Sequence, residues 1–239
     1  MRQGSHGTIL ATPPAVGWPP DDTEESVVGT NLHQETIKNL SWGLNEVASV
    51  LAPPGAPAPW QALSQTAISG LRRWDGTPYT VLPDVFVYRH PIDELRATLY
   101  LDQEGPPALI AEVLSPTTHV GDLDLVYGKG YSYAQAGVRE YLIVDPTGAY
   151  IGEQVQGWRL EGGVYVPWRP EADGRWRSRE IGVAIGFEGV RVVVHTGDGR
   201  RLPREGEVLR TVRALEDRLA QRDAEIAELR RLLGERDRG

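Results

Sequence analysis

The chain has 239 residues, a formal net charge of −8 and no cysteine. This length fits one domain with appendages, and the lack of cysteine excludes disulfides, thiolate nucleophiles and cysteine-based metal sites. Hydrophobic residues make up 40% and charged residues 24% of the sequence, which excludes a wholly disordered or fibrous chain. No apolar run is long enough to cross a bilayer and no signal peptide is evident, so we expect a cytoplasmic protein without a membrane partner.

The negative charge is concentrated in the body of the protein. Residues 204–239 hold nine arginines and nine acidic residues, so residues 1–203, with 16 basic and 24 acidic residues, carry the whole net charge of −8. Such a body disfavours non-specific binding to nucleic acid, which needs clustered positive charge. Only two of the basic residues are lysines, Lys38 and Lys129.

The N-terminal part of the chain predicts a leader followed by a helix. Residues 1–26 combine proline, glycine and acidic residues without periodicity, which predicts a disordered leader. A helix is predicted over residues 32–51, with Asn31 as its N-cap and Gln34 completing a capping box. Its apolar stripe consists of Ile37, Leu40, Leu44, Val47 and Leu51. His33 lies within this stripe, so we expect it to face inward.

The body that follows is rich in predicted strands. Three segments of β-branched and aromatic residues bounded by Pro, Gly or Asp predict strands: residues 79–90, 106–115 and 139–146. Between the last two, a helix is predicted over residues 124–136, and Gly137 is expected to end it. Residues 147–200 contain short aromatic strands broken by glycine turns, which predicts an antiparallel β extension.

The last segment, residues 204–239, has a different pattern. Apolar side chains alternate by four and three with one polar interruption, at Val208, Val212, Leu215, Leu219, Arg222, Ile226, Leu229 and Leu233. This heptad pattern with charged flanks favours a coiled coil that pairs two copies into a homodimer. A solvated helix packed on its own domain is the alternative. With fewer than four heptads, the pairing is expected to be weak on its own.

Two carboxylates interrupt otherwise apolar strands. Glu112 lies in the segment LIAEVL, which is apolar on both faces, as in a central strand. Asp84 directly follows Pro83 at the start of the strand DVFVY. Carboxylates on neighbouring strands are able to share a divalent ion such as Mg²⁺ or Mn²⁺. The alternative is that Glu112 pairs with an arginine or caps a loop.

Several fragments, taken in order and at their spacing, resemble the Uma-two family of restriction endonucleases, within the PD-(D/E)XK nuclease-like superfamily. The resemblance runs from about residue 24 to residue 200. It rests on His33-Gln34, Pro83-Asp84, Gly105-Pro106-Pro107, Glu112-Val113-Leu114-Ser115-Pro116, Lys129 with Tyr133, Gly137-Val138-Arg139-Glu140-Tyr141 and Asp145-Pro146. It implies a restriction-endonuclease-like α/β domain over residues 27–203, a mixed sheet flanked by helices, with the β extension at about 147–200.

The resemblance also implies a magnesium-dependent phosphodiesterase site that acts on nucleic acid, with DNA as the expected substrate. Asp84 and Glu112 would be the catalytic metal ligands, joined by the main-chain carbonyl of Val113. The motif's usual lysine position holds Leu114, so the resemblance implies that Lys129, on the following helix, takes that role. The alternative is that Lys129 is a surface lysine.

Secondary candidates and a rival function remain open. Tyr133 shares a helix face with Lys129. His33 is either a proton shuttle or a buried histidine with satisfied hydrogen bonds. Asp122 and Asp124 flank the start of the predicted helix, where capping is the simpler explanation than metal binding. The rival to a metal-dependent DNA endonuclease is a catalytically inactive binding module that keeps the nuclease fold and associates through its coiled coil.

Overall fold

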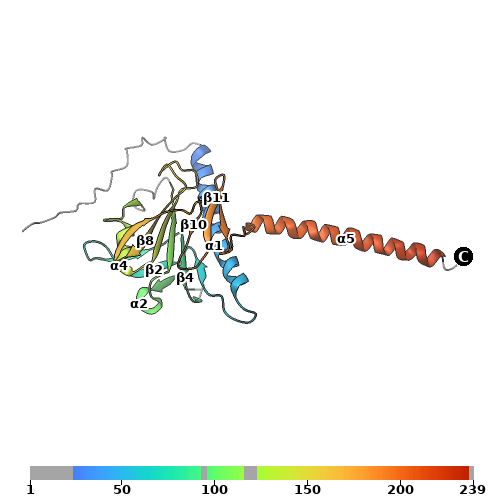
Figure 1. Ribbon diagram of the computed structural model, residues 1–239, viewed down its shortest axis with the longest axis horizontal. Helices are drawn as coiled ribbons and strands as arrows, with labels where there is room; N and C mark the ends of the chain where they lie inside the picture. The colour runs from blue at the N-terminus through green and yellow to red at the C-terminus, as the bar shows by residue number, and fades with distance from the viewer. Residues whose placement is uncertain (1–23, 93–95, 116–122, 237–239) are drawn as a thin grey trace, which may run out of the picture.

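The computed structural model describes residues 24–92, 96–115 and 123–236 (Figure 1). Most of the predicted leader therefore lies outside the described residues. Within the part that is described, no helix is long and apolar enough to span a membrane.

A six-stranded mixed sheet forms the centre of the protein. In spatial order it consists of β1 (Gln61–Leu63), β4 (Val85–Tyr88), β6 (Leu109–Val113), β7 (Glu140–Val144), β8 (Val155–Glu161) and β9 (Val164–Trp168). Within this sheet only β6 and β7 pair in parallel, and every residue of these two strands is buried. The prediction of a mixed sheet with β6 as a fully buried strand is confirmed.

Two smaller sheets cover parts of the central sheet. One has the order β3 (Pro78–Val81), β2 (Ala67–Arg72), β5 (Thr98–Tyr100). The other is antiparallel, with the order β10 (Trp176–Arg177), β11 (Ala184–Glu188), β12 (Arg191–His195). The predicted β extension is thus divided, because β8 and β9 continue the central sheet and β10–β12 form a separate layer.

The predicted strand over residues 79–90 is wrong as a single strand. Its first part is β3 and its second part is β4, and these strands belong to different sheets. Pro83 lies between them. Proline has no N–H group to give to a sheet, which explains why the pairing stops here and the chain changes sheets.

Two of the described helices begin at other residues than predicted. The first, α1, spans Glu24–Leu51, so Asn31 lies inside it and is not its N-cap. The helix α4 spans only Lys129–Ala136, with Gly128 as its N-cap. Before it, Asp124 accepts hydrogen bonds from the N–H groups of Val126 and Tyr127 at 2.9 and 2.8 Å, so this acid stabilises a turn instead of a helix.

The end of α4 is as predicted. Gly137 adopts a left-handed conformation with φ 89°, and its N–H donates to the carbonyl of Ala134 at 3.1 Å. Glycine reaches this conformation without steric cost, which is why it ends the helix here. A further short helix, α2 (Leu101–Glu104), lies between β5 and β6.

The core lies on both faces of the central sheet. One face packs against α1 and the β10–β12 sheet, with members such as Leu40, Leu44, Val113 and Val194. The other face packs against α4 and the β3–β2–β5 sheet through residues such as Phe86, Ile110, Tyr133 and Tyr141. Because β6 and β7 are covered on both sides, they contain apolar residues almost throughout.

The C-terminal helix α5 (Glu205–Arg236) projects away from the body as one long helix (Figure 1). Ion pairs attach its first turn. Glu205 contacts Lys38 of α1 at 2.5 Å, and Glu207 contacts Arg201 at 2.9 Å. These contacts hold the base of α5 beside α1.

Gly43 lies where α1 packs closely against β12. A Cβ atom at this position would lie 2.8 Å from Cγ2 of Val194. We therefore expect Gly43→Ala to lower the free energy of unfolding by about 1–3 kcal/mol, as overpacking does, although the same change in an open helix stabilises. Urea unfolding measures this.

The matched control for that experiment is Gly43→Ala combined with Val194→Ala. The smaller side chain leaves room for the new methyl group, so the cost of the double variant is expected to be less than the sum of the single costs. Strict additivity would contradict the packing of α1 on β12.

Candidate active site

Glu112 is the buried acid at the centre of the candidate site. It lies in β6 among apolar residues, and its side chain is 1% exposed. Because side chains alternate across a strand, Glu112 shares a face with Ile110, on the side of the sheet that packs against α4. A buried carboxylate is stable only where hydrogen bonds and opposite charge compensate for its lost hydration.

Two separate elements supply this compensation. From α4, the hydroxyl of Tyr133 donates to Oε1 of Glu112 at 2.5 Å, and Nζ of Lys129 lies 3.1 Å from the same oxygen. From the turn before β4, the backbone N–H of Asp84 donates to Oε2 of Glu112 at 3.4 Å. Tyr133 and Lys129 are four residues apart, so one helix face presents both to the carboxylate.

Asp84 is held beside Glu112 by a second backbone hydrogen bond. Its Oδ2 accepts the N–H of Val113 at 2.8 Å. Each acid thus accepts an N–H group from the other strand, Glu112 from residue 84 and Asp84 from residue 113. This reciprocal bonding brings the two carboxylates together across neighbouring strands.

His33 of α1 reaches the site from the opposite layer. Its Nε2 lies 3.8 Å from Oδ1 of Asp84. Its Nδ1 is buried and has no hydrogen-bond partner among the residues described. Of the two predicted roles, a buried histidine with satisfied hydrogen bonds does not match this geometry.

Charged and titratable groups lie close together in the site. Oε1 of Glu112 lies 3.1 Å from Nζ of Lys129, and Oδ1 of Asp84 lies 3.8 Å from Nε2 of His33. Burial raises the pKa of Tyr133 well above its usual 10, and the negative charge of Glu112 raises it further. Tyr133 therefore keeps its proton at neutral pH and acts as a hydrogen-bond donor to Glu112.

The oxygen-rich donor set suits a hard divalent cation. No group of three or more His, Asp or Glu side chains placed to hold an ion occurs in the described ranges, so protein ligands would come from two carboxylates and the backbone. Mg²⁺ ordinarily uses one or two carboxylates and keeps several waters. Asp84 and Glu112 fit that requirement, and the Val113 carbonyl remains a predicted third ligand.

The structure brings most of the predicted site residues together. Those that converge are His33, Asp84, Glu112, Lys129 and Tyr133. The carboxylate of Asp124 accepts hydrogen bonds in the turn before α4 and is not part of this group. Asp122 lies outside the described residues.

Two polar residues near the site were missed from the sequence. Ser64 and Gln65 directly follow β1, which pairs with β4 in an antiparallel register that sets Leu63 opposite Phe86. Gln65 is two residues past this last pair and Asp84 is two residues before Phe86, so both lie at the same end of the β1–β4 pair. No local pattern signals such a neighbour, because it depends on the pairing of two strands that are distant in the sequence.

We expect Tyr133→Phe to lower the free energy of unfolding by about 1.5–3 kcal/mol, because Glu112 stays buried and loses its hydroxyl donor. The matched control is Tyr165→Phe, which removes a hydroxyl that donates to the neutral carbonyl of Val138 at 3.1 Å. That control is expected to cost about 1 kcal/mol. Urea unfolding of both variants compares them, and an equal loss would show that Glu112 does not depend on Tyr133.

Comparison with known proteins identifies the family of this chain. Residues 26–193 match the family model described as "Uma2: Putative restriction endonuclease". No curated protein and no solved structure gave a significant match. The matched span covers more than half of the chain and includes all the residues that converge on Glu112, and it agrees with the mixed α/β fold of a restriction-endonuclease-like protein. The chain therefore belongs to the Uma2 family.

Proposed function

We propose that this protein is a divalent-metal-dependent endonuclease that hydrolyses phosphodiester bonds in nucleic acid, with DNA as the preferred substrate. The observation that carries the proposal is the pairing of two carboxylates beside a lysine. Asp84 and Glu112 are held together by reciprocal backbone hydrogen bonds, and Nζ of Lys129 lies 3.1 Å from Oε1 of Glu112. Adjoining carboxylates supply the oxygen ligands that a divalent cation such as Mg²⁺ prefers. The family description points to the same activity.

The metal, Mg²⁺ or Mn²⁺, would be held by Asp84, Glu112 and the carbonyl of Val113. When bound, such an ion polarises a phosphoryl oxygen and lowers the pKa of a bound water. Side chains of the protein would have separate roles beside the ion. The ammonium of Lys129, 3.1 Å from Glu112, stabilises the charge that builds on the phosphate oxygens.

Tyr133 and His33 support the two carboxylates. Tyr133 fixes the orientation of Glu112 through its hydrogen bond and does not exchange its proton, because its pKa is raised. His33 lies beside Asp84 with a partly exposed ring, a position from which it is able to carry a proton between the site and solvent.

The position of Lys129 separates this proposal from an inactive binding module. The motif's usual lysine position holds Leu114, and the acidic body also favours the binding module. However, α4 brings Lys129 to within 3.1 Å of Glu112, so a lysine reaches the carboxylates by another route. This contact supports the enzyme.

We also propose that two segments of the chain have different roles. Residues 27–203 would form the nuclease domain and residues 204–239 a dimerisation segment. An enzyme that acts on intracellular DNA would work in the cytoplasm, where we place it.

The proposed dimer is a coiled coil of α5. Apolar side chains of its heptad pattern are exposed to solvent: Val212, Leu215, Leu219, Ile226 and Leu229. Leu219 is the most exposed of these, at 68%. A second copy of the helix would bury this row, and charged residues flank it on both sides.

The flanking charges favour a parallel pair. With Leu219 at an a position, Arg218 is a g residue and Asp223 is the following e residue. In a parallel dimer Arg218 faces Asp223 of the second copy, which is attractive. In an antiparallel dimer Glu216 faces Asp223 of the second copy, and both are acidic. A parallel pair also places both nuclease domains at the same end.

Metal binding is the first test. We expect calorimetric titration with Mn²⁺ to show one site per chain, and Asp84→Asn and Glu112→Gln to abolish it, because each removes an anionic ligand. Asp102→Asn, an exposed acid in the first turn of α2, is the control and should bind normally. Unchanged Mn²⁺ binding by Glu112→Gln would contradict the proposed site.

Activity is the second test. We expect cleavage of DNA with Mg²⁺ or Mn²⁺ and not with Ca²⁺, and a loss of about 10²–10³ in kcat for Lys129→Met with Mn²⁺ binding retained. Arg200→Ala, at an exposed ion pair, is the control. Absence of cleavage by the wild type on single- and double-stranded DNA and RNA would favour the binding module.

The dimer is tested by light scattering over a range of concentrations. We expect Leu219→Lys to give a monomer, because a charge enters the apolar row. Asp223→Arg decides the orientation, since it weakens a parallel dimer by facing Arg218 and strengthens an antiparallel one by facing Glu216. A wild-type mass of one chain at every concentration would exclude the coiled coil.

A further inference from the structure

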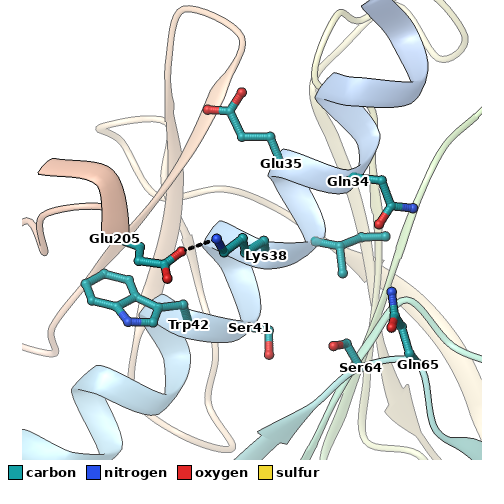
Figure 2. A pocket seen from close by; sticks show the side chains of 9 residues that line it. Gln34, Glu35, Lys38, Ser41, Trp42, Ser64, Gln65 and Glu205 are labelled. Atoms are coloured by element: carbon teal, nitrogen blue, oxygen red, sulfur yellow. Dashed lines mark ion pairs between the residues drawn. The ribbon is translucent and has the colours of Figure 1, made fainter. Parts of the chain in front are cut away.

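A groove lies beside the candidate active site, between α1 and the chain that follows β1. Its volume is about 620 Å³, which is within the usual range of small-ligand sites. Figure 2 shows the side chains that line it, with Gln34 from α1 and Gln65 after β1 on one side. Ser41 and Ser64 lie between them and Trp42, whose indole is at the far end near α5.

The residues of the groove are linked to the candidate site through α1 and β1. On α1, Gln34 directly follows His33, whose Nε2 is 3.8 Å from Oδ1 of Asp84. On the other wall, Gln65 lies two residues past the Leu63–Phe86 pair, at the same end of the β1–β4 pair as Asp84. A molecule in this groove would therefore lie at the same end of the sheet as the carboxylates of the proposed nuclease site.

The charges in the groove are neutralised in pairs. Lys38 contacts Glu205 at 2.5 Å, and Glu35 contacts Arg191 at 3.3 Å. The remaining polar groups are amides and hydroxyls, which make no strong site for a phosphate. They do suit a flat, uncharged group with hydrogen-bond donors and acceptors along its edge, which is the chemistry of a nucleobase.

The backbone at Gln65 gives an independent indication. Its φ is 54°, in the left-handed region, which is uncommon for a residue other than glycine and costs free energy. Glycine or asparagine would occupy this position at lower cost. Gln65 combines this costly backbone conformation with a place on the groove wall, which makes its amide a candidate for binding.

We propose that this groove binds one nucleobase next to the scissile phosphate, with the amides of Gln34 and Gln65 hydrogen-bonding to its edge. The inference rests on the proposed nuclease function and extends it, since it makes the groove the place where the enzyme reads a base. The base must leave its stack to enter, so a single-stranded segment is the expected ligand.

The test is binding without catalysis. Fluorescence anisotropy at low salt, with EDTA present, measures binding of a labelled 12-nucleotide mixed-sequence single-stranded DNA and of a 12-unit strand in which every base is replaced by an abasic analogue. We expect Gln34→Ala and Gln65→Gly each to weaken binding of the first strand about fivefold, the contribution of one hydrogen bond. Neither should change binding of the abasic strand.

Matched variants separate the amide from folding. Gln65→Gly relieves the backbone strain while it removes the amide, so its thermal stability should not fall. Gln65→Asn keeps an amide and should recover part of the affinity. Gln221→Ala removes an exposed amide from α5, far from the groove, and should bind both strands as the wild type does.

The outcomes distinguish this inference from the nuclease proposal. An equal loss on both strands, no loss on either strand, or no binding of the base-containing strand by the wild type would overturn the groove as a base site. If binding depends on the bases and on both glutamines while DNA with Mg²⁺ stays intact, the groove stands and the nuclease proposal fails. Cleavage without any effect of Gln34→Ala and Gln65→Gly gives the reverse result.

Discussion

The requirement to stabilise one buried carboxylate organises this protein. The other residues of the strand that holds Glu112 are all apolar, so the negative charge of Glu112 must be compensated by the elements packed on its face of the sheet. The helix α4 supplies Tyr133 and Lys129, and the turn before β4 supplies the N–H of Asp84. The position of α4 and the interruption of strand pairing at Pro83 therefore serve the same site. The layer on the other face adds His33 through α1.

The distribution of charge explains why the two proposals belong together. A body with a net charge of −8 gains little from general attraction to phosphates. The proposals name three other sources of affinity for a nucleic acid: a metal at the carboxylates, contacts with uncharged bases, and two sites presented at once. The groove lined by Gln34 and Gln65 would provide the base contacts, and a parallel pair of α5 helices would present two sites.

The local patterns that gave correct predictions were those that allow only one structural interpretation. The apolar stripe of Leu40 and Leu44 gave a helix that packs on the sheet, and the run around Glu112 gave a central strand. Gly137 ended α4 because few residues adopt its conformation. The predicted starts of the first helix and of α4 were wrong. Side chains such as those of Asn31 and Asp124 are able to form the same local hydrogen bonds inside a helix, in a turn or at a true N-cap, so their presence alone does not mark a helix start.

The sequence by itself determined the alternation of strands and helices, the heptads of α5 and, through the family resemblance, the grouping of Asp84, Glu112 and Lys129. Only the tertiary structure decided that Tyr133 bonds directly to Glu112, and that the backbone groups of residues 84 and 113 hold the two acids together. It alone placed Gln65 and Asp84 at the same end of the β1–β4 pair. The physical reason is that periodicity and capping act within a few residues of the chain, whereas strand register and helix packing join residues that are far apart in sequence.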